Sequence, residues 1–283
     1  MQQNIKFGVS GNSLKFFESG LKHTIEAPSY LNKLGLDAYE ISFGRGITLG
    51  DDKAIEISQE CKKNNIDVSV HAPYYINLAN PSQDMIDKSF MYIINCCKKV
   101  NLLGGNRVVV HSGTQGKMSY ANAFELVKQR LKVLTQLIYD NSLQNNLICL
   151  ETMGKSSQIG TAEEVIELCS IDNIYIPTLD FGHIYARSLG KLNTYDDYVK
   201  ILENMLTKLG ERSKRLHIHF SKIEFGKFGE IRHLTFDNST YGPEFEPLAK
   251  ALKCLDLSPT IMCESAGTQD IDACTMKKIY NNI

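Results

Sequence analysis

Histidine and carboxylate side chains recur in this sequence at the ends of short apolar segments. The candidate metal ligands are His71, His111, Glu151, Asp180, His183, His217, His233 and Glu264. Imidazole nitrogens together with carboxylate oxygens suit Zn²⁺, Mn²⁺ or Fe²⁺. This set exceeds what one ion needs, so it predicts two or three ions that share bridging carboxylates. Such ions, about 3.5–4 Å apart, can clamp the attacking and leaving oxygens of a phosphoester displacement.

Each candidate has a structural alternative, because a histidine near a strand end is commonly a hydrogen-bonded structural residue. Ligand-type residues at successive strand ends make coincidence a poor explanation. Among the histidines, only His23 falls in a helix-like segment, and we interpret it as a surface residue. His219 shares a face with His217 by strand alternation, and we expect it only to shape the pocket. Glu40 could be a ligand, a substrate contact or a salt-bridge partner, and we prefer the last interpretation.

Short apolar segments alternate with longer amphipathic segments along the chain. The predicted strands are Lys6–Val9, Ala38–Ser42, Asp67–His71, Arg107–His111, Leu147–Glu151, Tyr175–Asp180, Leu216–Phe220 and Thr260–Glu264. The predicted helices include Asp51–Asn64, Ser82–Leu103, Tyr120–Gln144 and Thr194–Leu209. Parallel strands need helical crossovers, and strands buried on both faces are apolar throughout. Eight such units favour an α/β fold of the (β/α)8 TIM barrel type.

This fold would bring the candidate ligands to one face, since barrel active sites lie at the carboxyl ends of the strands. The longest irregular stretch, Ser221–Pro243, follows the seventh strand, and a loop of this length is usually functional. We expect a single domain over residues 1–283, with the metal site at the carboxyl ends of its strands.

Composition limits the class of protein. A net charge of −1 gives no strong whole-molecule attraction for polyanions, so phosphate binding would depend on local Lys and Arg. No apolar run reaches the length of a membrane span, and the N-terminus carries no signal-peptide pattern. Eight cysteines without a CxxC pair are typical of free thiols in a reducing compartment. We expect a cytoplasmic, soluble monomer.

Seven motifs occur in the order found in one known enzyme family. They are His71-Ala-Pro-Tyr-Tyr-Ile-Asn-Leu-Ala-Asn-Pro81, Val110-His-Ser-Gly113, Glu151-Thr-Met-Gly154, Asp180-Phe-Gly-His-Ile-Tyr-Ala186, His217-Ile-His-Phe-Ser-Lys222, Arg232-His233 and Glu264-Ser265. With these motifs the chain resembles the endonuclease IV family of apurinic/apyrimidinic endonucleases, within the xylose isomerase-like barrels. The match covers nearly the whole chain.

The resemblance implies a three-zinc site that cuts double-stranded DNA on the 5′ side of an abasic sugar. Motif by motif, it assigns the first ion to His71, His111 and Glu151. Glu151 would bridge to a second ion, completed by Asp180, His217 and Glu264, and the third ion would be held by His183 and His233. The resemblance also implies catalytic roles for Glu151 and Glu264, with Glu264 orienting the attacking water.

The chain departs from the family pattern mainly near the third ion. The family has Asp-Arg-His after the seventh strand, but here Ile231 precedes Arg232 and cannot bind metal. Glu230, one position earlier, is a possible replacement. The family's Asn-Asp pair is replaced by His219-Phe220, and Ser188 replaces a glycine. These changes put the third ion and the DNA-facing loops in question, but not the fold.

The resemblance also points to DNA contacts. Arg45, Tyr74 and Tyr75 lie in loops that would enter the DNA, and Lys222 and Arg232 could contact phosphates. The structural alternatives are a packed pocket wall for the tyrosines and a solvated surface for the charges. A metal-dependent sugar isomerase or epimerase on the same barrel is the alternative function. Ile231 and the near-neutral charge favour it, whereas His183 together with His233 favours the nuclease.

Overall fold

The structure, a computed structural model, describes residues 5–283. Eight parallel strands close into a barrel in the order β1-β10-β7-β6-β5-β4-β3-β2. Their bounds are β1 Lys6–Ser10, β2 Ala38–Ser42, β3 Asp67–His71, β4 Arg107–His111, β5 Leu147–Glu151, β6 Tyr175–Asp180, β7 His217–Phe220 and β10 Thr260–Cys263. The predicted (β/α)8 barrel is confirmed, and each strand agrees with its predicted bounds to within one residue.

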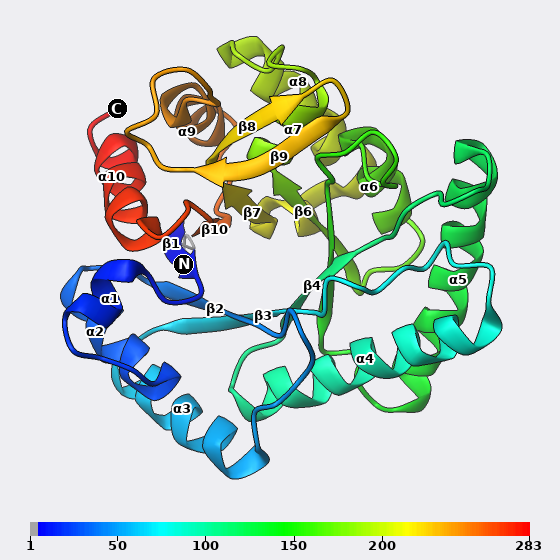
Figure 1. Cartoon of the computed structure of the whole chain (residues 1–283), viewed down its shortest axis with the longest axis horizontal. Coiled ribbons are helices and arrows are strands. Elements are labelled where there is room, and N and C mark those ends of the chain that lie inside the picture. The colour runs from blue at the N-terminus through cyan, green and yellow to red at the C-terminus, as the bar shows by residue number, and fades with distance from the viewer. Residues whose placement is uncertain (1–4) are drawn as a thin grey trace.

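Helices surround the barrel (Figure 1). They are α1 Leu14–Glu18, α2 Ala27–Lys33, α3 Asp51–Lys63, α4 Gln83–Leu102, α5 Tyr120–Asp140, α6 Ala162–Cys169, α7 Phe181–Arg187, α8 Tyr195–Leu209, α9 Phe245–Cys254 and α10 Gln269–Asn281. Capping boxes start α6 at Thr161 and α8 at Thr194, where each hydroxyl accepts a hydrogen bond from a first-turn amide. Within residues 5–283, no helix is both long enough and apolar enough to cross a membrane.

Two hydrophobic clusters separate the inside of the barrel from its outside. The larger one fills the space between strands and helices. The smaller one contains Val109, Cys149 and Ile176 on three adjacent strands. Residues two apart on a strand share a face, so His111 and Glu151 point into the barrel interior one layer above Val109 and Cys149. The strands therefore hold the candidate ligands above a packed inner layer.

The segment Ser221–Pro243, expected to be irregular, in fact contains an antiparallel hairpin of β8 (Lys222–Gly226) and β9 (Gly229–Leu234). The hairpin packs against α7 (Figure 1). Glu224 lies opposite Arg232 and Phe225 opposite Glu230, which leaves Ile231 as an extra residue in β9. This is a β-bulge, a local irregularity that redirects the side chains around it.

Candidate metal centre

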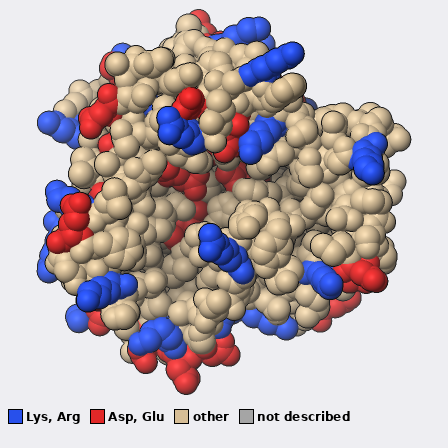
Figure 2. Space-filling model, viewed as in Figure 1, with Lys and Arg blue, Asp and Glu red and all other residues tan. Residues whose placement is uncertain are grey.

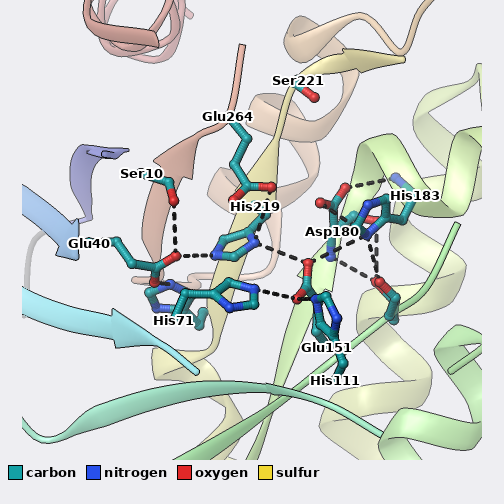
Figure 3. A network of polar contacts seen from close by, with 12 residues as sticks. Ser10, Glu40, His71, His111, Glu151, Asp180, His183, His219, Ser221 and Glu264 are labelled. Atoms are coloured by element: carbon teal, nitrogen blue, oxygen red, sulfur yellow. Dashed lines mark hydrogen bonds and ion pairs between the residues drawn. The ribbon is translucent and has the colours of Figure 1, made fainter. Parts of the chain in front are cut away.

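Glu151, the last residue of β5, lies at the centre of the site (Figure 3). Its Oε2 is 3.1 Å from His71 Nε2 and 2.9 Å from His111 Nε2. Its Oε1 is 3.2 Å from His219 Nδ1 and 3.4 Å from His183 Nδ1. The two oxygens of this buried carboxylate therefore face different sets of histidines. This is the geometry that a carboxylate shared between two metal ions requires.

The first group of potential ligands is His71, His111 and Glu151, whose ligand atoms lie within 4.8 Å of one another. His111 and Glu151 are register partners on β4 and β5, so they lie at the same height in the barrel. His71 Nδ1 donates a hydrogen bond to the backbone oxygen of Ala72 at 2.8 Å. This bond fixes the ring and turns Nε2 toward Glu151, as hydrogen-bond acceptors behind metal-binding histidines do.

The second group is Glu151, Asp180, His219 and Glu264. His217, assigned to this ion from its motif, is not part of it, and His219, expected only to shape the pocket, takes its place. The strand register gives the reason. Asp180 pairs with His219, whereas His217 pairs with Thr178 and so lies one layer deeper in the barrel. Strand register, rather than motif position, is the signal that shows which histidine lies beside Asp180.

The third group is His183, Glu230 and His233. Glu230 and His233 are three residues apart, and on a regular strand such residues point to opposite faces. The bulge at Ile231 cancels this alternation, so both side chains face His183. Glu230, considered a possible ligand from the sequence, thus joins His183 and His233, although it is one residue further from Arg232 than the aspartate of the family pattern.

Close backbone packing supports this third group. Glu230 Oε2 is 3.4 Å from His183 Nε2, and His183 Nδ1 donates to the carbonyl oxygen of Thr152 at 2.9 Å. A Cβ on Gly154 would lie 2.6 Å from Glu230 Cβ and 3.0 Å from His183 Cδ2. Only glycine at this position of the Glu-Thr-Met-Gly motif leaves room for the hairpin. His233 Nδ1 is 2.8 Å from Ser221 Oγ, which leaves its Nε2 free.

Asp180 couples the sixth strand to the helix that carries His183. It is the N-cap of α7, and its Oδ1 accepts a hydrogen bond from the amide of His183 at 2.7 Å. A carboxylate is a favoured N-cap because it satisfies an unpaired amide of the first turn. The cap places the imidazole beside the same carboxylate, with Asp180 Oδ2 3.2 Å from His183 Nδ1.

The ligand candidates shift one another's proton affinities strongly. Burial would lower the pKa of His71, but Glu151 outweighs it and raises this pKa to about 9. Burial would raise the pKa of Glu151, but His111 and His219 hold it well below the usual range. Burial raises the pKa of Asp180. Several carboxylates thus depend on cationic neighbours to remain ionised.

The site fits a cluster of divalent ions. Asp180 Oδ2 is buried and has no hydrogen-bond partner among the described residues, and a buried polar atom without a partner is costly. Glu151, Asp180, Glu264 and Glu230 converge with histidine nitrogens, a donor set typical of zinc and related metals. Figure 2 shows acidic side chains inside the central hollow, with Lys and Arg at points around it.

The residues expected to contact DNA lie in different environments. Arg45 is exposed, as are Tyr74 and Tyr75, whose side chains are 62% and 40% accessible. Arg232 is exposed and pairs with Glu224 at 2.7 Å. The assignment of Lys222 to a phosphate is wrong. This residue is only 6% exposed, and its ammonium is held by Glu244 and the backbone oxygen of Asn238, each at 2.8 Å.

Comparisons with known proteins agree with this architecture. The family described as xylose isomerase-like TIM barrel matches residues 28–277. An uncharacterized protein of Methanocaldococcus jannaschii is 36% identical over 91% of this chain and 92% of its own. A protein of Staphylococcus carnosus, named as a probable endonuclease 4, is 27% identical over 73% of this chain and 72% of its own.

Two solved structures share the fold. A D-tagatose 3-epimerase-like protein superposes with a TM-score of 0.73 at 18% identity, covering 98% of this chain and 97% of its own. Endonuclease IV from Thermus thermophilus gives 0.71 at 18% identity, covering 98% of this chain and 100% of its own. At this identity the likeness concerns the fold alone. The matched family model establishes that the chain belongs to the xylose isomerase-like TIM barrel family, and the relatives of this chain include proteins named as probable endonuclease 4.

Proposed function

We propose that this protein is a metal-dependent phosphodiesterase that cuts double-stranded DNA on the 5′ side of an abasic site. The observation that carries the proposal is the third group, in which His183, Glu230 and His233 converge beside the shared Glu151. A single-ion isomerase site has no need of these residues. The similarity to proteins named as probable endonuclease 4 points the same way.

In this proposal the three groups hold three divalent ions, with zinc preferred and manganese or iron(II) as substitutes. His71, His111 and Glu151 would hold one ion, and Glu151, Asp180, His219 and Glu264 would hold another. The third group holds the third ion. Such ions activate water and neutralise the charge that develops on a phosphate.

The protein's own groups orient the reaction. Glu264 is the carboxylate of its group closest to solvent, with 16% of its side chain exposed, so it can meet a phosphate that enters the hollow. We assign it the task of orienting the attacking water. Hydrogen bonds behind His71 and His183 hold these rings before substrate arrives, which lowers the cost of reorganisation during the reaction. Arg45, Tyr74 and Tyr75 line the outer surface where DNA would lie.

A sugar isomerase or epimerase is the second candidate. The second group alone, Glu151, Asp180, His219 and Glu264, supplies a complete set of ligands for one ion. The D-tagatose 3-epimerase-like structure shares the fold, although that likeness does not extend to activity. On this alternative the third group would be a hydrogen-bonded cluster without metal.

The two candidates are separated by offering both substrates to zinc-loaded and manganese-loaded protein. We expect a duplex with one tetrahydrofuran abasic analogue to be nicked directly 5′ to the analogue, and the same duplex without it to stay intact. Chelator should abolish the nick. Conversion of a ketohexose to its C3 epimer, with the abasic duplex left intact, would reject the nuclease in favour of the epimerase.

A further inference from the structure

A buried polar network lies inside the barrel, behind the second group of ligands. Glu40 of β2 is fully buried, and its Oε1 is 2.9 Å from His219 Nε2. Its Oε2 is 2.9 Å from His217 Nε2 and accepts a hydrogen bond from Ser69 Oγ at 2.8 Å. Figure 3 shows Glu40 on the opposite side of the His219 ring from Glu151.

The contact between Glu40 and His219 crosses the barrel interior. Strands β2 and β7 are not neighbours, since β1 and β10 lie between them in the barrel order. A carboxylate in such a place is unfavourable unless its oxygens are paired. Here a second histidine, His217, and a hydroxyl, Ser69, surround it, so the network is built to keep an ionised carboxylate behind His219.

We propose that Glu40 is a positioning residue that fixes the His219 ring with Nδ1 facing Glu151, Asp180 and Glu264. This inference rests on the proposed metal centre. A neutral imidazole carries one N–H. Nε2 is 2.9 Å from Glu40 Oε1 but does not make a well-aligned hydrogen bond to it in the structure; with the hydrogen on Nε2, facing Glu40, the lone pair of Nδ1 is left for the ion. A carboxylate behind a histidine ligand also makes the ring a stronger base toward metal.

The group behind the His219 ring differs from the groups behind the two other histidines whose rings are held from that side. His71 and His183 donate to neutral backbone oxygens, those of Ala72 and Thr152. Only for His219 among these three is a carboxylate the nearest group behind the ring, since His183 Nδ1 lies closer to the Thr152 oxygen than to Asp180 Oδ2. The ion in the second group therefore gains a ligand of higher basicity, and Glu40 is the residue that supplies it.

His217 acquires a different role from the one its motif suggested. Its Nε2 is engaged by Glu40, and its Nδ1 has no hydrogen-bond partner among the described residues. It holds the second oxygen of Glu40, as Ser69 does. Glu40, His217 and His219 could themselves enclose an ion, because their ligand atoms lie within 4.8 Å of one another. That arrangement would make Glu40 a ligand rather than a positioning residue.

The test measures zinc binding to wild type, Glu40→Gln, Ser69→Ala and, as a matched control in another group, Glu230→Gln. An amide at position 40 has one acceptor where the carboxylate has two, so the ring of His219 loses its fixed partner. Competition with a chelator gives the affinity of each ion, and elemental analysis gives the number of ions at saturation. Ring-nitrogen NMR reports which nitrogen of His219 carries hydrogen. The His219 signal is identified as the one that is missing in His219→Gln.

We expect Glu40→Gln to keep the full number of ions but to weaken one of them about 10–100-fold, the usual effect of losing such a partner. The His219 signal should change from a single tautomer to a mixture, and Ser69→Ala should act in the same direction but less. Glu230→Gln should leave the His219 signal unchanged. If Glu40→Gln does not fold, the zinc affinity and the His219 NMR signal of Ser69→Ala test the inference instead.

Two results would overturn the inference. One is zinc affinity in Glu40→Gln within about threefold of wild type for every ion, with the tautomer unchanged. The other is one ion fewer at saturation, which would make Glu40 a ligand. A wild type that binds no zinc would instead reject the proposed metal centre, so the two failures are distinguishable.

Discussion

At the scale of single residues, the site is organised by which nitrogen of each histidine is already engaged. His71 and His183 each direct Nδ1 to a backbone oxygen, and His219 directs Nε2 to Glu40. In His71 and His219 the other nitrogen faces Glu151, and in His183 it faces Glu230. Binding of an ion would therefore require little rotation of these side chains.

Metal binding should release protons near neutral pH. Glu151 raises the pKa of His71 to about 9 in the protein without metal, so we expect this ring to be protonated at pH 7.5. An ion binds only the neutral ring, and the proton must leave. Affinity should therefore rise with pH up to about 9 and level off above it. Calorimetric titration in two buffers of different ionisation enthalpy measures the release, and a heat of binding independent of buffer would contradict it.

Glu264→Gln should preserve the fold and nearly abolish nicking of the abasic duplex. The amide keeps the shape of the side chain but loses the charge that binds metal and orients water. Activity and circular dichroism are measured on the same preparation. A loss of less than about tenfold, equivalent to about 1.4 kcal/mol of barrier, would argue against the role assigned to Glu264.

At the scale of secondary structure, the third group depends on a hairpin that reaches over α7 and packs on the backbone of Gly154. Gly229 also approaches this segment closely, since a Cβ there would lie 2.1 Å from the Gly154 oxygen. The bulge at Ile231 then sets Glu230 and His233 on one face. In a hairpin of this length, the third group forms only if the bulge lies at Ile231 and position 154 is glycine.

Gly154→Ala should selectively weaken the third ion. The added methyl group would meet the side chain of Glu230 at 2.6 Å and push the hairpin away from His183. We expect this variant to lose one ion to chelator well before wild type does, while the other two stay bound. Deletion of Ile231 leaves Glu230 and His233 two residues apart, and such residues share a face on a regular strand, so this variant should keep the third ion. Equal loss of all ions in Gly154→Ala would show that the hairpin does not serve one site selectively.

The barrel and most residues of the candidate site could be predicted from sequence, and the exceptions have physical reasons. Strand periodicity and ligand-type residues at strand ends identify the eight strands and locate His71, His111, Glu151 and Asp180. The choice between His217 and His219 depends on the register between β6 and β7, which periodicity within one strand does not contain. The burial of Lys222 depends on contacts with residues 238 and 244, in a segment without regular periodicity.

At the scale of the whole molecule, the barrel concentrates carboxylates at one end of an otherwise tightly packed interior. Repulsion among Glu151, Asp180 and Glu264 opposes folding unless cations lie between them. Divalent ions that bind only the folded chain would offset this repulsion, and they would link residues on strands β3, β4, β5, β6 and β7 with Glu264, which follows β10.

Removal of metal should therefore lower the melting temperature. An ion at about 100 times its Kd stabilises the folded state by about 2.7 kcal/mol. For a chain of this size that corresponds to roughly 5–10 °C per site. Scanning calorimetry with zinc and with chelator measures the difference, and magnesium at the same concentration serves as a control for ionic strength. A melting temperature that does not change would show that the carboxylate cluster is stable without ions.

The proposed metal centre holds three ions, with the third held by His183, Glu230 and His233. Its most direct test is a crystal structure of the zinc-loaded protein, with anomalous scattering at the zinc edge to locate the ions. We predict a third ion within about 2.0–2.2 Å of one nitrogen of each of these histidines and of a Glu230 oxygen. Two ions at full occupancy around Glu151, with none between His183 and His233, would contradict it and favour the epimerase.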